Sequence, residues 1–370
     1  MSKTRCFAVI AAAMLCIECG GSKSANPQPT SSSPVAPTAP ATPAPGQTLT
    51  ATQHGQVISN LTLTSTAGPC IVVSGLNDVW IDHVQLGPCA AQGIRVEGAA
   101  RLRITNSIIH TGHGGQGQVD SGDGVYIRNS TDVIVQGNQF ADNETSVETY
   151  ASRNTSIIGN YSLNPLGPFP RGQHFQLTNG SDGSQITDNF GEQNPRFRGP
   201  VGDQRYIEDA INIYQTGDVT IARNYLRGGD AENGCGIIAG DSNGGIPGNG
   251  VTITDNVMVR TSNCGIGVAG GSGHVVRRNR ILDTNFEGGS GNIGIYVWDY
   301  RSLGTCSNIT VRDNIVSNLL PNGTFADYWD GGNCRSLDIG NNTFGNGARA
   351  LLTPEGSQLP APSIPPRSYP

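Results

Sequence analysis

Lysine is nearly missing from this chain of 370 residues, in which it occurs only at Lys3 and Lys23. Every later cationic side chain is therefore an arginine or a histidine. Chemistry that depends on a lysine base is excluded beyond residue 23. An Arg, His or Tyr would have to take that role in any proton abstraction.

A basic surface and helical patterns are also absent. The 23 Lys and Arg are outnumbered by 29 Asp and Glu, which argues against a nucleic-acid partner because such a partner needs a basic stripe. Between Thr48 and Leu352 we find neither helix caps nor apolar residues at i, i+4 spacing. Aromatic residues make up only 6% of the chain, whereas glycines number 51, a balance that suits thin stacked units.

What is present is a recurring phrase: apolar, any, apolar, any, any, Asn. It is clearest in VIVQGN and VTITDN, which end at Asn138 and Asn256. The alternation and the β-branched residues indicate a strand. The final slot of the phrase recurs at intervals of 22 to 35 residues, at His83, Asn106, Asn138, Asn160, Asn189, Asn224, Asn256, Asn279, Asn314 and Asn342.

A repeat of this length predicts stacked coils, since a propeller blade needs about 40 residues and four strands. We expect an all-β fold, a right-handed parallel β-helix solenoid of about ten coils. The Asn would take the left-handed conformation at a turn and form a side-chain ladder between coils. The alternative is a β-sandwich with ordinary turn asparagines, which does not predict a recurring phrase.

A second strand recurs between the markers, as in GVYIR from Gly124 and AINIY from Ala210. We expect the second and fourth residues of each copy to point inward, as Ile211 and Ile213 would. The first, third and fifth residues would point outward. The middle outward column would read Arg95, Tyr126, Glu148, Gln176, Asn212, Ile238, Gly267 and Tyr296.

This pattern resembles the right-handed parallel β-helix superfamily, the pectate-lyase-like group, over roughly Gln56 to Phe344. The resemblance implies the fold. It implies little about activity, because that superfamily includes lyases, hydrolases, epimerases, phage spikes and surface adhesins. Some of its lyases use a lysine base, which this chain cannot supply.

The N-terminal segment predicts export. Residues 1–19 join Lys3 and Arg5 to an apolar run that is too short to span a membrane, and they end at Cys19. They resemble a bacterial lipoprotein signal with Cys19 as the lipidated residue, although Cys16 and Glu18 depart from the usual lipobox. Ordinary cleavage and secretion is the alternative. We therefore expect a periplasmic or cell-surface lipoprotein, held on its membrane by a lipid anchor, or else a secreted protein.

Composition divides the rest of the chain. Residues 20–47 form a Pro/Ser/Ala-rich linker, residues 48–352 the β-helix domain and residues 353–370 a Pro-rich tail. A solenoid grows by adding coils, so this length suits one domain. We expect it to be a monomer.

Six cysteines follow the signal, and their spacing predicts three disulfides. Cys235 and Cys264 occupy the same slot of successive coils, and so do Cys306 and Cys334. Stacked positions lie about 4.8 Å apart, within the range that a disulfide bridges. Elimination pairs Cys70 with Cys89. The pairs indicate an oxidising compartment.

The outward columns predict a carbohydrate groove near the middle of the solenoid, because polar groups would bind hydroxyls and aromatic rings would cover sugar faces. An insertion from Phe190 to Tyr206 would bring arginines to its edge. The expected substrate-binding residues are Tyr126, Arg128, Gln176, Asn212, Arg196, Arg198, Tyr296 and Trp298. The expected catalytic residues are His174, Arg205, Glu208, Asp209 and Tyr214.

Two kinds of chemistry fit these residues. In a lyase or epimerase acting on uronate-containing glycans, arginines would neutralise the sugar carboxylate, and His174 or Tyr214 would remove the C5 proton. In a hydrolase, Glu208 and Asp209 would be acid and base, but sequential strand residues point to opposite faces, which disfavours this option. We expect the lyase or epimerase. The alternative is a non-catalytic β-helix that binds glycan or has a structural role. Calcium is a possible cofactor.

Overall fold

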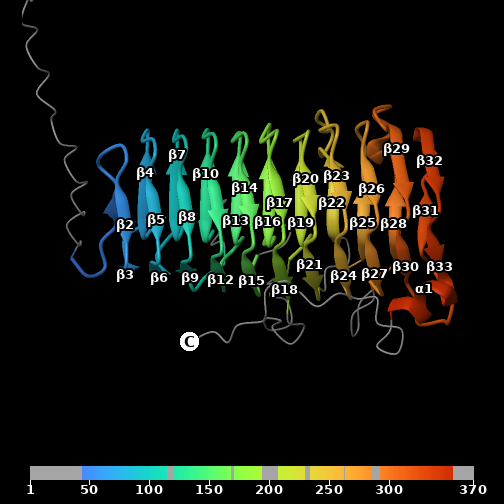
Figure 1. The fold of residues 1–370 in the computed structure, drawn as a ribbon, viewed down its shortest axis with the longest axis horizontal. Helices are drawn as coiled ribbons and strands as arrows, with labels where there is room; N and C mark the ends of the chain where they lie inside the picture. Colours follow the sequence, from blue (N-terminus) through green and yellow to red (C-terminus); the bar gives the residue numbers. More distant parts are fainter. Residues whose placement is uncertain are drawn as a thin grey trace, which may run out of the picture. The chain divides into compact units, whose positions relative to one another are not determined.

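The structure, a computed structural model, describes residues 44–114, 121–167, 171–193, 207–229, 234–261, 263–284 and 292–352. They form an all-β, right-handed parallel β-helix of three sheets with eleven parallel strands each. The coils follow one another in chain order, from β2 (Val57–Ser59) to β32 (Arg335–Gly340) (Figure 1). The expected fold class is confirmed. The extra coil begins with VIS before Asn60, a short copy of the repeated phrase.

Each coil contributes one strand to every sheet. The first sheet contains β1 (Leu49–Thr50), β4 (Ile71–Ser74), β7 (Ile94–Glu97), β10 (Val125–Arg128), β13 (Val147–Tyr150), β16 (Phe175–Thr178), β19 (Ile211–Tyr214), β22 (Cys235–Asp241), β25 (Cys264–Val268), β28 (Ile293–Val297) and β31 (Tyr328–Asp330). The second contains β2, β5 (Trp80–Asp82), β8 (Arg103–Thr105), β11 (Ile134–Gln136), β14 (Ser156–Ile158), β17 (Gln185–Thr187), β20 (Thr220–Ala222), β23 (Thr252–Thr254), β26 (Val275–Arg277), β29 (Ser307–Arg312) and β32. The third contains β3 (Thr62–Ser65), β6 (Gln85–Cys89), β9 (Ile108–Ile109), β12 (Gln139–Ala141), β15 (Tyr161–Leu163), β18 (Phe190–Glu192), β21 (Tyr225–Arg227), β24 (Val257–Val259), β27 (Arg280–Leu282), β30 (Ile315–Ser317) and β33 (Thr343–Phe344).

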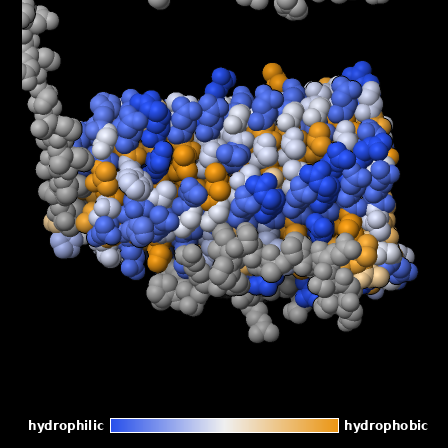
Figure 2. Space-filling model, in the orientation of Figure 1, coloured by the Kyte–Doolittle hydropathy of each residue, from blue (hydrophilic) through white to orange (hydrophobic). Residues whose placement is uncertain are grey.

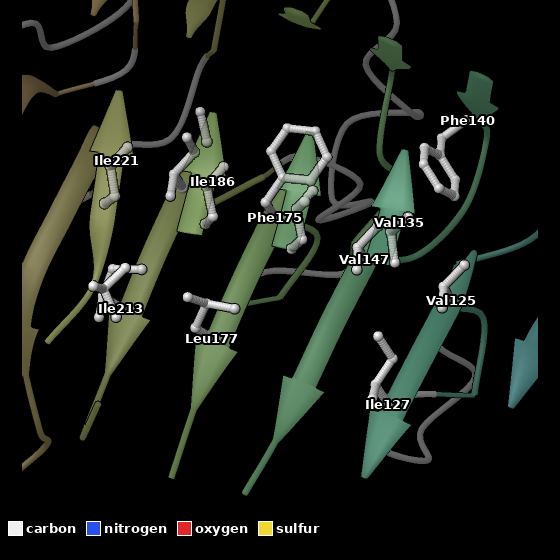
Figure 3. Close-up of a cluster of buried hydrophobic side chains, with 14 of the residues drawn as sticks. Val125, Ile127, Val135, Phe140, Val147, Phe175, Leu177, Ile186, Ile213 and Ile221 are labelled. Carbon is white, nitrogen blue, oxygen red and sulfur yellow. The ribbon is translucent and has the colours of Figure 1, made fainter. Parts of the chain in front are cut away.

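The core lies between the sheets and runs through all the coils. Ile211 and Ile213 are fully buried, as their alternation predicted. Side chains from neighbouring strands of the first sheet form rows, for example Leu177 and Ile213 (Figure 3). On the face drawn in Figure 2, hydrophilic side chains predominate and apolar ones are scattered. Apolar burial of this kind stabilises a fold by about 25 cal/mol per Å².

A ladder of buried amides runs beside this core. Each side-chain Nδ2 donates to the Oδ1 of the next asparagine at 2.9–3.1 Å. The predicted ladder is therefore present from Asn138 to Asn342. The left-handed residue, however, is the one before each ladder asparagine, such as Asp188 or Arg223. Asn106 is itself left-handed, and Ser107 aligns with Asn138.

Arginine rather than lysine suits the corner beside this ladder. Arg223 and Arg278 directly precede ladder asparagines, and Arg101 lies at the corner between the first and second sheets. Each reaches the aspartate of the preceding coil with two nitrogens, at 2.7–2.8 Å. A planar guanidinium matches both carboxylate oxygens at once, which an ammonium group cannot do. These exposed pairs define the register between coils more than they add stability.

The expected outward direction of the first residue in each GVYIR-like copy is wrong. The strands of the first sheet from β7 to β19 begin one residue later, so the chain is still turning at that position. Ser146, His174 and Ala210 are all buried there. A Cβ at Gly124 would lie 2.8 Å from Phe140, and one at Gly294 would lie 2.3 Å from Val316. Glycine recurs in this column because the interior has no room for a side chain.

Two short helices were not predicted. A 3-10 helix, η1, covers Tyr300–Ser302, and α1 covers Gly345–Leu352. Helix α1 buries Ala348 and Leu352 completely, and Arg349 pairs with Asp283 at 2.9 Å. Eight residues are too few for a pronounced sequence period, so only packing identifies this helix. Within the described residues, neither helix has the length and apolar character needed to cross a membrane.

All three predicted disulfides are present. The Cα atoms lie 5.5 Å apart in Cys70–Cys89, 4.4 Å in Cys235–Cys264 and 4.7 Å in Cys306–Cys334. The last two values match the spacing of stacked coils. Disulfides persist in oxidising environments, so they indicate a location outside the cytoplasm. Cys19 lies outside the described residues, and lipidation stays a prediction.

Candidate functional site

A groove of about 1180 Å³ lies on the outer face of the first sheet. Its floor is the middle outward column, which pairs in direct register from Tyr126 to Asn212 and then through Ile238 and Gly267 to Tyr296. This confirms the predicted order. The column ends at Trp329, which pairs with Tyr296. Eight strands at strand spacing give the floor a length of about 34 Å.

Three acidic side chains meet in the middle of this groove: Glu208, Asp209 and Asp241. Glu208 and Asp209 precede β19. Asp241 ends β22 and lies opposite Tyr214, because an irregularity between Asn212 and Tyr214 inserts an extra residue on the β22 side. Gly240 would otherwise occupy that place. Strand alternation does not apply to Glu208 and Asp209, because neither residue belongs to a strand, although only Glu208 is partly exposed to the groove.

Asn212 and a backbone amide hold the three acids together. Asn212 Nδ2 donates to Asp209 Oδ2 at 2.8 Å, and its side chain also donates to Asp241. The N–H of Cys235 donates to Asp209 Oδ1 at 2.7 Å. Asp209 is buried, whereas Glu208 and Asp241 are partly exposed to the groove. Asp209 therefore lies behind the other two and organises them.

The three acids hold fewer than three negative charges at neutral pH. Burial, and then the charge of Asp241, raises the pKa of Glu208 to about 7. Burial, and then the charge of Glu208, raises the pKa of Asp209 well above its ordinary range. Burial also raises the pKa of Asp241, although hydrogen bonds oppose that shift. Neighbouring carboxyl groups with raised pKa values supply an acid and a base at one place.

Two amide oxygens of the floor lie next to this cluster and have no hydrogen-bond partner among the described residues. They are Gln176 Oε1 and Asn212 Oδ1, from residues paired in β16 and β19. Leaving a buried acceptor unsatisfied costs about 1–3 kcal/mol. Both would be satisfied by hydroxyl groups of a ligand in the groove.

The two ends of the groove differ in chemistry. Tyr126, Arg128, Glu148 and Arg171 line the end nearer the N-terminus, where the guanidinium of Arg128 lies 5.4 Å from the ring centre of Tyr150. The other end is lined mainly by aromatic and aliphatic residues, namely Ile293, Tyr296, Trp298, Tyr300, Leu320, Ala326 and Trp329. Asn263 and Asn292 also line it.

Most of the predicted site residues lie together. Those that line the groove are Tyr126, Arg128, Gln176, Glu208, Asp209, Asn212, Tyr214, Tyr296 and Trp298. Arg196, Arg198 and Arg205 lie outside the described residues. Asp241 was missed because the extra residue in β22 cannot be read from the alternation.

The expectation that His174 faces the groove is wrong. Its side chain is inside the coil, with 1% of its surface exposed, and its Nδ1 lies 2.6 Å from Ser162 Oγ. Burial lowers its pKa to about 3, so the ring stays neutral. Tyr214 does line the groove. Its hydroxyl donates to the Ser242 carbonyl, and burial raises its pKa, so it is a poor base.

The described residues contain no group of three or more His, Cys, Asp or Glu side chains arranged to hold a metal ion. Calcium binding stays a prediction.

Comparison with known proteins supports the fold. Residues 48–202 match the family model described as a right handed beta helix region. No curated protein matches the chain. Among solved structures, Dettilon tailspike protein is 16% identical, over 79% of this chain and 60% of that one, with a TM-score of 0.56.

Two further structures are similar at a lower level. A mutant of the periplasmic alginate epimerase AlgG is 13% identical over 78% of this chain and 77% of that one, with a TM-score of 0.47. PfbA, a surface adhesin of Streptococcus pneumoniae, is 12% identical over 72% and 63%, with a TM-score of 0.42. The likeness to the tailspike protein, at 16% identity, shows the β-helix fold alone, and the activity has to be argued from the groove.

Proposed function

We propose that this exported β-helix protein binds a polysaccharide along its groove and hydrolyses a glycosidic bond at Glu208, Asp209 and Asp241. The observation that carries the proposal is the meeting of these three carboxyl groups around Asn212, in the middle of a long groove. Glycoside hydrolysis needs two carboxyl groups, one protonated and one ionised. A groove that continues on both sides of the cluster suits cleavage within a glycan chain.

The surroundings of each acid suggest its role. Glu208 is partly exposed and its pKa of about 7 keeps much of it protonated near neutrality, so it would donate a proton to the leaving oxygen. Asp241, also partly exposed and held by Asn212, would activate water or attack the anomeric carbon. Asp209 would position the other two through Asn212. Inverted or retained stereochemistry in the product would distinguish the two roles of Asp241.

The expected lyase or epimerase is the second candidate. Its support is the position of Arg128 and Arg171 in the groove, where a guanidinium would neutralise a uronate. The two residues expected to act as the base in this mechanism are unsuitable, since His174 is buried and the pKa of Tyr214 is raised. A non-catalytic glycan-binding protein is the third possibility.

One experiment separates the three. The purified protein is incubated with neutral and acidic polysaccharides, with and without calcium, while new reducing ends and the absorbance of unsaturated uronates are followed together. Hydrolysis predicts reducing ends alone. Both signals would establish a lyase, and binding without either would leave an epimerase, tested by NMR, or a binding protein.

Variants then test the roles of the acids. Glu208→Gln and Asp241→Asn should each lower turnover about a hundredfold or more. Gln85→Ala, on an exposed strand position of the third sheet, is the control and should leave turnover unchanged. Full turnover by both carboxyl variants would overturn the proposal.

A further inference from the structure

We propose that the C-terminal half of the groove, beyond Asp241, is a subsite for uncharged sugar residues that present an apolar face, such as deoxy or N-acetylated sugars. This inference rests on the proposed binding of glycan in the groove, and it names the sugar class for which the groove is built.

The described lining of this half of the groove carries no charged side chain. Between Asp241 and the end of the groove, no described lining residue is an Asp, Glu, Lys, Arg or His. Polar contacts there come from amides such as Asn263 and Asn292. Arg301 lies just outside this lining, with its guanidinium 5.2 Å from the ring centre of Tyr300. A uronate placed in this half would lose water, and it would approach the partly ionised cluster of Glu208, Asp209 and Asp241. Like charges close together in a partly dry groove repel strongly.

Three aromatic side chains form a platform in this half of the groove. The rings of Trp298 and Trp329 have centroids 5.9 Å apart at 66°, and those of Trp298 and Tyr300 are 5.0 Å apart at 67°. Edge-to-face contacts of this kind stabilise ring positions. Trp329 remains 46% exposed. It therefore presents an indole of fixed orientation to the groove.

Glycines in neighbouring coils make room for these rings. A Cβ on Gly331 would lie 2.7 Å from Trp298, and one on Gly267 would lie 2.6 Å from the ring of Tyr296. Tyr296 thus lies flat over the preceding coil, pointing toward Cys235 and the carboxyl groups. With Ile238 and Ala269, the rings form a smooth apolar floor that can contact the face of a sugar ring.

The other half of the groove provides the contrast. Arg128, Glu148 and Arg171 lie there, together with the unsatisfied amide oxygen of Gln176. That half can bind polar or charged sugars. A regular polyuronate would place a carboxylate in both halves, so the occupant we infer is a neutral glycan or a heteropolysaccharide with an uncharged residue beyond Asp241.

The three tryptophans of the chain allow a direct test. Trp80 lies on β5 in the second sheet, where its Nε1 donates to Thr105, away from the groove. Trp80→Phe therefore leaves Trp298 and Trp329 as the only tryptophan fluorophores. Adding Glu208→Gln prevents turnover during titration. The probes are glucose, rhamnose and N-acetylglucosamine hexasaccharides, with hexagalacturonate as the acidic counterpart.

We expect at least one neutral hexasaccharide to change the tryptophan fluorescence in a saturable way. Its dissociation constant should be at least tenfold lower than that of hexagalacturonate. Trp329→Ala in the same background should weaken that binding about tenfold. Quenching by hexagalacturonate alone, or by no oligosaccharide, would overturn the inference, as would unchanged affinity in the Trp329→Ala variant. Because binding is read without turnover, a protein that binds neutral sugars but hydrolyses nothing would overturn the proposed activity and leave the subsite standing.

Discussion

The buried asparagines are the residues that join successive coils. Asn224 Oδ1 accepts from the Asn189 backbone N–H at 3.1 Å and from Asn189 Nδ2 at 2.9 Å, and its Nδ2 donates to the Ile186 carbonyl at 2.8 Å. Asn224→Ala leaves these groups unsatisfied inside the protein. We expect unfolding to become easier by about 2–4 kcal/mol.

Urea denaturation followed by tryptophan fluorescence measures this change. Gln85→Ala removes an amide from an exposed strand position and is the matched control, with an expected effect within about 0.5 kcal/mol. Equal effects of the two substitutions would show that the ladder contributes nothing beyond ordinary strand pairing.

Glu208 links stability to pH in the direction opposite to an ion-paired acid. Because its folded pKa is about 7 and its unfolded value is lower, its favourable contribution is full at pH 4. That contribution is lost as pH rises through 7, where the folded state must ionise a partly buried group. We expect Glu208→Gln to raise the melting temperature at pH 8 and to change it little at pH 4. A destabilised variant at pH 8 would contradict this assignment.

Turnover should depend on the same proton. If Glu208 donates a proton to the leaving group, kcat falls tenfold per pH unit above its pKa. The alkaline limb of the pH profile should then be centred near pH 7. The Glu208→Asp substitution moves the carboxyl group back by one methylene. We therefore expect a lower kcat, with an alkaline limb still present in the pH profile. An alkaline limb that remains at the same pH in Glu208→Gln would assign it to another group.

At the scale of elements, two disulfides of nearly equal span can be compared. Cys235–Cys264 and Cys306–Cys334 close 29 and 28 residues, so removing either should cost about 3 kcal/mol. Only Cys235 also donates its N–H to Asp209 in the groove. The Cys235→Ser, Cys264→Ser double variant should therefore lose most turnover, whereas the Cys306→Ser, Cys334→Ser variant should lose stability alone. The turnover of the two double variants is compared at a temperature below both of their melting temperatures. Equal loss of turnover in the two variants would show that β22 does not position the acids.

Regular strands were predictable from the sequence and irregular positions were not. Side chains alternate along a strand, so the register of Tyr126, Gln176 and Asn212 could be predicted, as could the cysteine pairs. The rule fails where a strand has not begun, which is why His174 was assigned to the wrong face. It also fails at an inserted residue, which is why Asp241 was missed. Repeated glycine in the column of His174 was the available signal for a crowded interior position.

Because the coils of the whole molecule are stacked, the same buried Ile→Ala substitution should have different effects in the first coil and in a central coil. Ile58 in β2 and Ile186 in β17 are both fully buried in the second sheet. Among the described strands, Ile58 has a neighbour on one side only, whereas Ile186 is paired with Ile157 and Ile221. Ile186→Ala should cost about 2–5 kcal/mol, because the cavity weakens the stacking on both sides.

Ile58→Ala should instead allow the first coil to open locally while the remaining coils stay folded. Hydrogen exchange resolves the two outcomes. In the Ile58→Ala variant, we expect faster exchange only in β2 and its neighbours. Turnover should be retained, because the groove begins several coils after β2. In the Ile186→Ala variant, exchange should accelerate in β14, β17 and β20 together. Turnover should fall, because the same coils also carry part of the groove floor. A uniform acceleration along the chain in both variants would mean that the solenoid unfolds as one unit, and that its ends and centre share one stability.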